Sequence, residues 1–439
     1  MSTTEQDTLL QHAQDLLRAA RAAGADMADT VMNVGSSVSV QRRLGKIEET
    51  ERAESRELGL RVFIGKCSAS VSCSSIDPSA FARLAEQAVA MARVVPEDPY
   101  TEIPEAPLPL DAALLDVDDP REPDIGTLIA RAACAEDAAM AVPGITNSEG
   151  ASASWSRSYS LLATSLGFAG VYPRSYHGVS VTAIAGSGTG MQRDYEYDSA
   201  SHSEDLEDPA ALGRRAAAQA LARLNPARPK TGKVPVMFHP RVAGSFLGHL
   251  AAAINGASIA RGTSFLKDRL GQAVFAPGMR IIDDPLRLRG RRSRPFDREG
   301  QPGATRAFIE DGVLTSWILD TRSANQLGLK STGHAGGTSN FYLEPGRLSP
   351  EALMADISEG LYVTEMIGMG VNGITGDYSR GAAGFMIRNG VLAEPVAEFT
   401  IAGTLQEIFA HITPASDLAF KRGTDSPTLR IEGMTLAGA

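Results

Sequence analysis

Residues 145–197 alternate between small polar residues and Val or Tyr along most of their length. Successive side chains of a strand point to opposite faces, so this pattern predicts long antiparallel strands with one covered face and one polar face. No regular alternation of strands with helices accompanies it, and no Walker or dinucleotide loop is present. The glycine-rich run at 186–190 precedes no helical pattern, so we interpret it as a strand bend rather than a phosphate cradle. The predicted fold class is therefore α+β.

Further periodic segments surround this region. Apolar residues at helical spacing predict helices at 5–23, 78–92, 124–141 and 204–224, and short β-type runs predict strands at 36–41, 59–64 and 69–73. The acidic, proline-rich segment 97–124 predicts an extended crossing on the surface. The uncharged stretch 242–260 contains His249, Asn255 and two serines, so we interpret it as a buried helix and turn rather than a membrane span.

Two turn signals predict β-hairpins in the second half of the chain. Asp311-Gly312 separates the runs 306–310 and 313–319, and Asn389-Gly390 separates 384–388 and 391–396. Asp-Gly and Asn-Gly tolerate the positive φ angles of a type I′ turn, so each dipeptide predicts a hairpin. Short helices are expected at 349–358 and 403–412.

The length of 439 residues exceeds a typical single core, so two domains are expected. The sequence Asn-Pro-Ala-Arg-Pro at 225–229 is the best candidate boundary, because proline restricts the residue before it and cannot continue a helix. We predict an N-terminal α+β domain at 1–225 and a C-terminal β-rich domain at 230–439, both with antiparallel sheets flanked by helices.

The formal net charge of −10 argues against a nucleic-acid partner, because an acidic surface repels phosphate backbones. A basic run from Arg287 to Arg294 has no interleaved aromatic residue, so we expect a solvated loop or a face for an acidic partner. The polar N-terminus lacks a signal pattern. The cysteines are too few for a disulfide framework and indicate a reducing compartment: Cys67, Cys73 and Cys134. We expect a cytoplasmic protein without a membrane segment.

Ordered sequence blocks in the second half resemble the PmbA/TldD family, once described as modulators of DNA gyrase. The blocks are RPFDREG at 294–300, TGH at 332–334, NFYLEPG at 340–346, GDYSRGAAGF at 376–385, SPTLRI at 426–431 and GMTLAG at 433–438. In the first half, GLRV at 59–62 and TNSEG at 146–150 match more loosely. The resemblance covers about residues 30–438 and implies a PmbA/TldD-like fold.

The resemblance also implies two branches within a peptidase family. The TldD-type branch carries HExxxH on a helix and a late cysteine, a ligand set that holds zinc and leaves a position open for water. The equivalent helix here reads GSFLGHLAAAIN at 244–255, with His249 as the only possible ligand. Leu250 and Ile254 stand in place of the glutamate and second histidine, and no cysteine follows Cys134. We therefore predict no metal ligand and no catalytic residue in this chain, and expect zinc in a TldD-type partner.

Two alternatives use the isolated histidines. His249, His334 and a carboxylate could form a new metal site, although a satisfied polar residue in a packed helix is the simpler interpretation of His249. A triad of Ser379, His334 and Asp377 lacks an elbow and an oxyanion motif.

A polar segment between glycines supplies the candidate substrate-binding residues. It could bind an extended peptide by adding it to a sheet edge, or it could only shape a bend in the chain. The candidates are Asn372, Asp377, Tyr378, Ser379 and Arg380.

The resulting hypothesis is a non-metal, PmbA/TldE-type subunit of a cytoplasmic two-subunit peptidase that acts on unfolded peptides and small proteins. It would pair with a TldD-type homologue and hold an extended peptide beside the metal of that partner. The first alternative is a homodimeric peptide-binding or regulatory protein without catalysis. The second is a metallopeptidase whose metal site has an unrecognised pattern.

Overall fold

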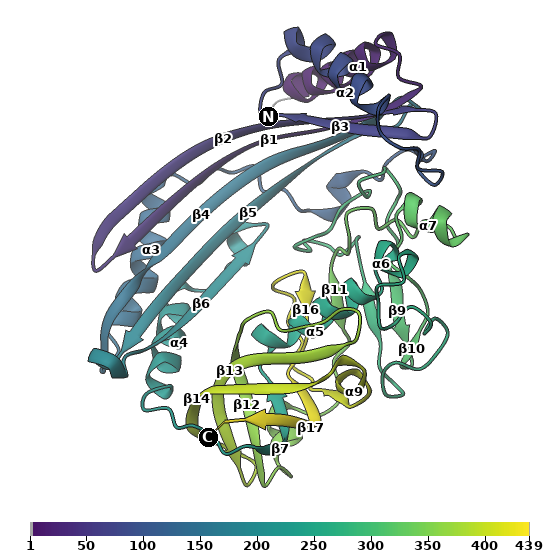
Figure 1. The fold of residues 1–439 in the computed structure, drawn as a ribbon. Coiled ribbons are helices and arrows are strands. Elements are labelled where there is room, and N and C mark those ends of the chain that lie inside the picture. Colours follow the sequence, from purple (N-terminus) through teal and green to yellow (C-terminus); the bar gives the residue numbers. More distant parts are fainter. Residues whose placement is uncertain (1–2, 439) are drawn as a thin grey trace.

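A long arched sheet lies over a second, β-rich half of the molecule (Figure 1). The computed structural model describes residues 3–438. The arched sheet has the strand order β3-β2-β1-β4-β5-β6, and all neighbouring strands are antiparallel. The strands are β1 (Met27–Arg43), β2 (Lys46–Ile64), β3 (Cys67–Cys73), β4 (Ile145–Thr164), β5 (Ala169–Ala185) and β6 (Gln192–Ala200). The alternating segment 145–197 therefore forms long antiparallel strands, as predicted.

Four helices pack on one face of this sheet. They are α1 (Thr3–Ala22), α2 (Phe81–Ala92), α3 (Ile125–Met140) and α4 (Pro209–Ala222). Near one end, α1 and α2 bury Met32 and Leu161, and near the other end α3 and α4 bury Val38 and Ala153. Even-numbered positions of β1 and odd-numbered positions of β4 therefore share the covered face, because side chains alternate along a strand. The alternate positions point to the opposite, concave face.

The second half contains two sheets with the orders β14-β13-β12-β7-β17-β15 and β10-β9-β8-β11-β16. An additional pairing of β14 with β17 closes most of the first sheet into a ring. Two pairs are parallel, β7 with β12 and β11 with β16, and the other pairs are antiparallel. The bounds are β7 (Gly232–Phe238), β8 (Ile281–Asp283), β9 (Arg306–Glu310), β10 (Val313–Leu314), β11 (Phe341–Leu343), β12 (Glu359–Ile367), β13 (Asp377–Arg388), β14 (Val391–Thr404), β15 (Ile412–Pro414), β16 (Thr424–Asp425) and β17 (Leu429–Ala437).

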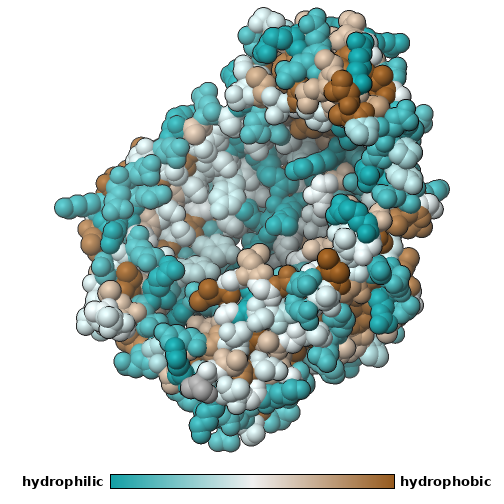
Figure 2. All heavy atoms as spheres, in the orientation of Figure 1, coloured by the Kyte–Doolittle hydropathy of each residue, from teal (hydrophilic) through white to brown (hydrophobic). Residues whose placement is uncertain are grey.

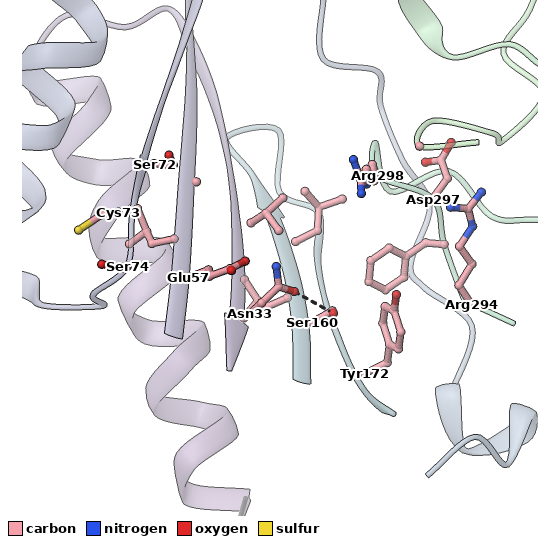
Figure 3. Close-up of a pocket in the computed structure, with 17 residues that line it drawn as sticks. Asn33, Glu57, Ser72, Cys73, Ser74, Ser160, Tyr172, Arg294, Asp297 and Arg298 are labelled. Carbon is pink, nitrogen blue, oxygen red and sulfur yellow. Dashed lines mark hydrogen bonds between the residues drawn. The ribbon is translucent and has the colours of Figure 1, made fainter. Parts of the chain in front are cut away.

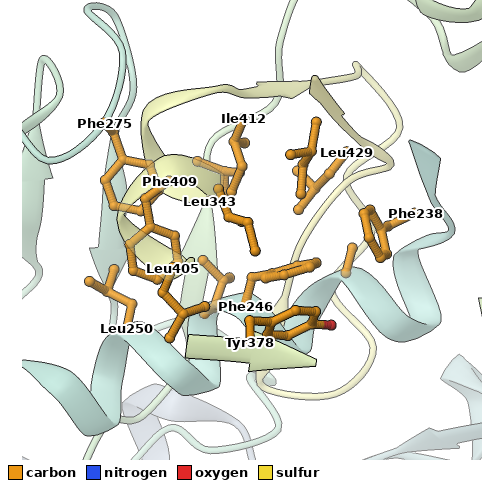
Figure 4. Packing of buried hydrophobic residues seen from close by; sticks show 14 of the residues in the cluster. Phe238, Phe246, Leu250, Phe275, Leu343, Tyr378, Leu405, Phe409, Ile412 and Leu429 are labelled. Atoms are coloured by element: carbon orange, nitrogen blue, oxygen red, sulfur yellow. The ribbon is translucent and has the colours of Figure 1, made fainter. Parts of the chain in front are cut away.

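The largest hydrophobic core fills this half and is organised around one helix (Figure 4). Phe246 of α5 contacts Phe238 edge-on at 4.9 Å and stacks on Tyr378 at 5.5 Å between ring centroids. Such aromatic pairs add to the stabilisation that burial of their area supplies. The helices of this half are α5 (Pro240–Ala253), α6 (Gly256–Ala260), α7 (Thr321–Leu327), α8 (Pro350–Met354) and α9 (Leu405–Ala410). The stretch 242–260 contains the predicted helix, whereas residues 256–260, expected as a turn, form the second helix α6.

A buried carboxylate joins the two halves. Asp194 of β6 accepts hydrogen bonds from Arg241 Nη1 at 2.6 Å and Nη2 at 3.0 Å, and from Arg223 Nη1 at 3.2 Å. Burial would raise the pKa of Asp194, but the two guanidinium groups outweigh it and hold this pKa below its usual value. The first turn of α5 is therefore fixed against the end of the arched sheet.

The basic run between Arg287 and Arg294 forms a second junction. Arg289 pairs with Asp116 at 2.6 Å and Asp205 at 2.9 Å, and the Arg291 guanidinium lies 4.7 Å from the ring centroid of Tyr176. The expectation of a solvated loop or a face for an acidic partner is wrong for these two arginines. The acidic segment 97–124 supplies Asp116, so charges that are remote in sequence neutralise each other within the chain.

Most predicted elements are present, with some different lengths. Both hairpins are confirmed, with Asp311 and Asn389 at positive φ. The strand predicted at 313–319 is wrong beyond residue 314, and the helix predicted at 349–358 ends at Met354. No helix within residues 3–438 is long and apolar enough to cross a membrane. The division into domains at 1–225 and 230–439 stays a prediction.

Candidate functional site

The concave face of the arched sheet lines a hollow that opens toward the second half (Figures 1 and 2). Tyr172, Tyr176 and Tyr197 of this face reach across it and contact the second half. Between these contacts the face is rich in partly exposed serines. The serines that face each other on adjacent strands are Ser37 and Ser156, Ser39 and Ser154, and Ser152 and Ser180. Because hydroxyl groups donate and accept hydrogen bonds, this surface can bind main-chain groups of any sequence.

One end of the hollow deepens into a cavity of about 850 Å³ between the sheet and the RPFDREG segment (Figure 3). Asn33 and Ser160 line the sheet wall, and the Ser160 hydroxyl donates to Asn33 Oδ1 at 2.9 Å. Glu57 lies on the same wall, and Arg298 lies on the opposite wall. Within residues 3–438, neither Glu57 nor Arg298 has an ion-pair partner within 4 Å. The cavity therefore presents free charges of opposite sign on its two walls.

The RPFDREG segment forms the wall opposite the sheet through close packing. Phe296 contacts Phe168 and Tyr172 edge-on, with ring centroids 5.2 and 5.3 Å apart. Gly170 allows this approach, since a Cβ there would lie 2.6 Å from the Phe296 ring. Burial raises the pKa of Asp297, although this carboxylate accepts backbone hydrogen bonds from residues 299, 301 and 335. The segment is thus a rigid turn that positions Arg298.

The helix α5 carries His249, the position that the sequence singled out as the only possible metal ligand. His249 is partly exposed, and its Nε2 atom is buried without a hydrogen-bond partner. Its ring lies 6.0 Å from the Tyr378 ring in an edge-on arrangement. Burial lowers the pKa of His249, and the nearby Arg380 guanidinium lowers it further. The expectation of a satisfied histidine in a packed helix is therefore wrong for its Nε2 atom.

Two other histidines of the second half, His334 and His239, have hydrogen-bond partners within the chain. His334 is buried, with Nε2 3.1 Å from Asp283 Oδ2 and Nδ1 2.7 Å from the carbonyl oxygen of Thr332. His239 caps α5, because its Nδ1 accepts a hydrogen bond from the backbone N–H of Arg241. Burial lowers the pKa of His239 to about 4, with Arg241 and Arg422 acting in the same direction. His334 and His239 therefore have structural partners of their own.

The side chains on α5 do not fit the zinc ion that the resemblance implies for its TldD-type branch. A catalytic zinc needs three protein ligands with a position left open. Within residues 3–438, no three His, Cys, Asp or Glu side chains come together as a group that could hold a metal ion. His249 faces Tyr378 and Arg380 rather than a carboxylate or thiolate.

The predicted substrate-binding segment lies at the start of β13, where its backbone is already paired on both sides. On one side, Asp377 to Arg380 pair with β14. On the other side, Ser379 N–H donates to the carbonyl of Gly370, and Asn372 N–H donates to that of Asp377. These main-chain groups already have partners within the chain, so they are not free to pair with an added peptide strand. Substrate binding by the five residues of this segment stays a prediction.

The five side chains of this segment have different environments. The side-chain oxygen of Asn372 accepts a hydrogen bond from the backbone N–H of residue 374, and the Asp377 carboxylate accepts one from the Thr375 hydroxyl. Tyr378 is 1% exposed and donates its hydroxyl to Met366 Sδ at 3.0 Å, so it is a core residue. Burial raises the pKa of Tyr378, and Arg380 opposes this shift. Ser379 is exposed, and Arg380 is partly exposed.

Sequence reasoning did not identify the cavity beside RPFDREG as a site. Its sheet wall comes from Asn33, Glu57 and Ser160, which lie on three strands and share no local motif. The RPFDREG block was the one sequence feature that could have indicated this site, since it contains charged residues next to the aromatic residue Phe296.

Family models match most of the chain. They describe PmbA/TldA metallopeptidase domain 1 at residues 28–92, the central domain at 118–224 and the C-terminal domain at 231–438. Metalloprotease PmbA of Escherichia coli O157:H7 is 37% identical over 417 residues, which cover 94% of this chain and 93% of that protein.

Two solved structures share the fold. A modulator of DNA gyrase from Bacteroides thetaiotaomicron superposes with a TM-score of 0.90 at 23% identity, covering 98% of both chains. TldE from Thermococcus kodakarensis superposes with a TM-score of 0.84 at 19% identity, covering 97% of this chain and all of that one. These similarities show the α+β fold.

Proposed function

The chain belongs to the PmbA/TldD metallopeptidase family, and from this membership we propose that it is the TldE-type subunit that holds the peptide while a TldD-type partner supplies the zinc. The proposal includes a cytoplasmic location and a substrate that is an extended or unfolded peptide. Catalysis would take place at the partner, so the side chains of this subunit bind and orient.

The environment of His249 is the observation that carries this proposal. The helix that bears HExxxH in the TldD-type branch offers a single imidazole here, and a cationic guanidinium stands near it. A divalent ion at this position would lose the favourable charge that carboxylate or thiolate ligands provide. A division of labour between two homologous subunits accounts for a family member with this ligand set.

The hollow is suited to an extended peptide. Its serine-rich face offers hydroxyl groups to a main chain without selecting particular side chains. The cavity beside RPFDREG adds Glu57 and Arg298, which can pair with charges on the peptide or its termini. Such a surface would bind extended peptides with little selectivity for their sequence. It would also favour unfolded chains, because their main-chain groups are accessible.

The test is to express the chain with and without a TldD-type homologue from the same organism. We expect the two proteins to co-purify, and we expect hydrolysis of an unstructured substrate such as casein only when both are present. Replacing the first histidine of HExxxH in the partner should abolish hydrolysis, whereas His249→Ala in this chain should leave the zinc content of the complex unchanged.

Two results would contradict the proposal. Chelator-sensitive hydrolysis by this chain alone would support a metal site with an unrecognised pattern. A stable homodimer that binds peptide but does not associate with the TldD-type homologue would favour the non-catalytic regulatory alternative.

A further inference from the structure

We propose that Arg380 and His249 form a carboxylate-binding site, at the place where the TldD-type branch carries its metal helix, and that this site takes a carboxylate group of the bound peptide. That the ligand is a peptide rests on the proposed function, whereas the preference for a carboxylate rests on the side chains described below.

Arg380 lies on the core-facing side of β13 without an acidic partner. Side chains alternate along the strand, and Arg380 shares its face with the buried residues Tyr378 and Ala382. No carboxylate within residues 3–438 lies within 4 Å of its guanidinium nitrogens. Its Nε atom is buried and has no hydrogen-bond partner. The guanidinium does share a side-chain hydrogen bond with Tyr378, but a phenol group does not supply the negative charge that a buried arginine normally pairs with. Arg380 therefore has an unused capacity to bind an anion.

A second unpartnered nitrogen lies nearby on α5. The Nε2 atom of His249 is also buried without a hydrogen-bond partner, and the His249 ring meets the Tyr378 ring edge-on. Tyr378 is two residues from Arg380 on the same strand, so the three side chains form one cluster. Two nitrogens without partners in one cluster indicate a missing group with acceptor atoms, and a carboxylate has two such oxygens.

The cluster is reachable from outside the protein. Gly248 is exposed beside His249, and a Cβ built on it would meet no other atom within 4 Å. Arg380 and His249 are themselves only partly buried. Asp377, the nearest acid along the strand, is exposed and accepts a hydrogen bond from Thr375 at 2.6 Å. A small anionic group can therefore approach the partly exposed side chains of Arg380 and His249 from solvent.

The chemistry of the cluster selects an anion over a cation. A guanidinium is permanently charged and presents its N–H groups in a planar fork that matches a carboxylate. Burial lowers the pKa of His249 and the Arg380 charge lowers it further, which leaves the imidazole neutral and able to donate from one nitrogen. The Arg380 guanidinium thus supplies a positive charge at this site without a metal ion. The complementary group on an extended peptide is a carboxylate.

Binding of matched peptides to the purified full-length chain tests this inference. The probes are three fluorescein-labelled, alanine-rich peptides of one length: a free C-terminal acid, its amide, and the amide with one internal glutamate. Fluorescence anisotropy should show the free acid binding about tenfold or more tightly than the plain amide, as expected for charge-assisted hydrogen bonds. A gain confined to the free acid assigns the site to the terminal carboxylate. A gain from the glutamate peptide as well assigns it to any carboxylate.

Variants connect the preference to the two side chains. Arg380→Gln should remove the difference between acid and amide, Arg380→Lys should retain part of it, and His249→Gln should weaken binding of the acid only. Arg388→Gln is the matched control on the same strand, because Arg388 is also partly exposed but pairs with Glu359 and Glu394. Circular dichroism checks that each variant is folded.

Equal affinity of all three peptides, or an acid preference that survives Arg380→Gln in a folded protein, would overturn the inference. Either result would leave the proposed function intact if the chain still supports hydrolysis with a TldD-type partner. Conversely, loss of that association would overturn the proposed function without changing the carboxylate preference.

Discussion

Asp194→Asn should destabilise the protein far more than loss of a surface charge. The Asp194 side chain is 2% exposed, and its partners Arg223 and Arg241 are 14% and 7% exposed. The substitution keeps the shape but leaves two nearly buried guanidinium groups without their shared anion. Removing one partner of a buried ion pair costs about 3–5 kcal/mol in the free energy of unfolding.

The assay is urea unfolding followed by circular dichroism at pH 7 and at pH 3. The folded-state pKa of Asp194 is lowered, so its contribution to stability is present above the unfolded value of 3.8 and is lost as the pH falls through the folded-state pKa. The difference between wild type and variant should therefore shrink at low pH. Glu149→Gln is the control, since its pair with Arg193 is exposed and should contribute less than about 1 kcal/mol. Equal effects of the two substitutions at pH 7 would refute this account of the junction.

Three further changes test other parts of the structure. Phe296→Ala should cost about 3–5 kcal/mol in unfolding free energy and weaken peptide binding, because it removes the aromatic anchor of the cavity wall; an unchanged urea midpoint would contradict this. Gly370→Ala should impair peptide binding more than Gly232→Ala, since a Cβ at 370 would lie 2.0 Å from the carbonyl oxygen of Ser379, the residue before Arg380, whereas one at 232 meets no atom within 4 Å. His239→Asn should flatten the loss of stability between pH 6.5 and pH 4. The lowered pKa of His239 makes its contribution present above 6.5 and lost as the pH falls, and asparagine keeps the helix cap. Parallel pH profiles for variant and wild type would exclude that role.

Local sequence signals predicted the elements that depend on neighbouring residues. The dipeptide Asn389-Gly390 indicates the hairpin because both residue types tolerate positive φ, and Asn389 adopts it. The helix α5 begins where proline is favoured, with Pro240 in its first turn. The alternation in 145–197 predicted strands because one face is covered by helices. In contrast, residues 46–57 of β2 are almost entirely exposed, so their strand carries no apolar alternation and was not predicted.

Long-range contacts could not be read from the sequence. Arg289 and Asp116 lie 173 positions apart, and nothing near either residue indicates that they pair. The pairing of β14 with β17 likewise could not be predicted, because the two strands meet only when the intervening strands of the sheet are in place. For the candidate site, the sequence indicated the single imidazole at His249 and the charge of Arg380, because both follow from residue type. Their shared cluster and the cavity between Glu57 and Arg298 required the fold.

Zinc stoichiometry of the isolated full-length chain tests the central claim most directly. The measurement is equilibrium dialysis of purified protein against micromolar zinc, followed by elemental analysis of wild type and His249→Ala. We predict no stoichiometric zinc in either protein, because the imidazole faces a guanidinium instead of further ligands. One zinc ion per chain in the wild type that disappears in His249→Ala would show that α5 does hold a metal, and would contradict the assignment of the catalytic ion to a partner.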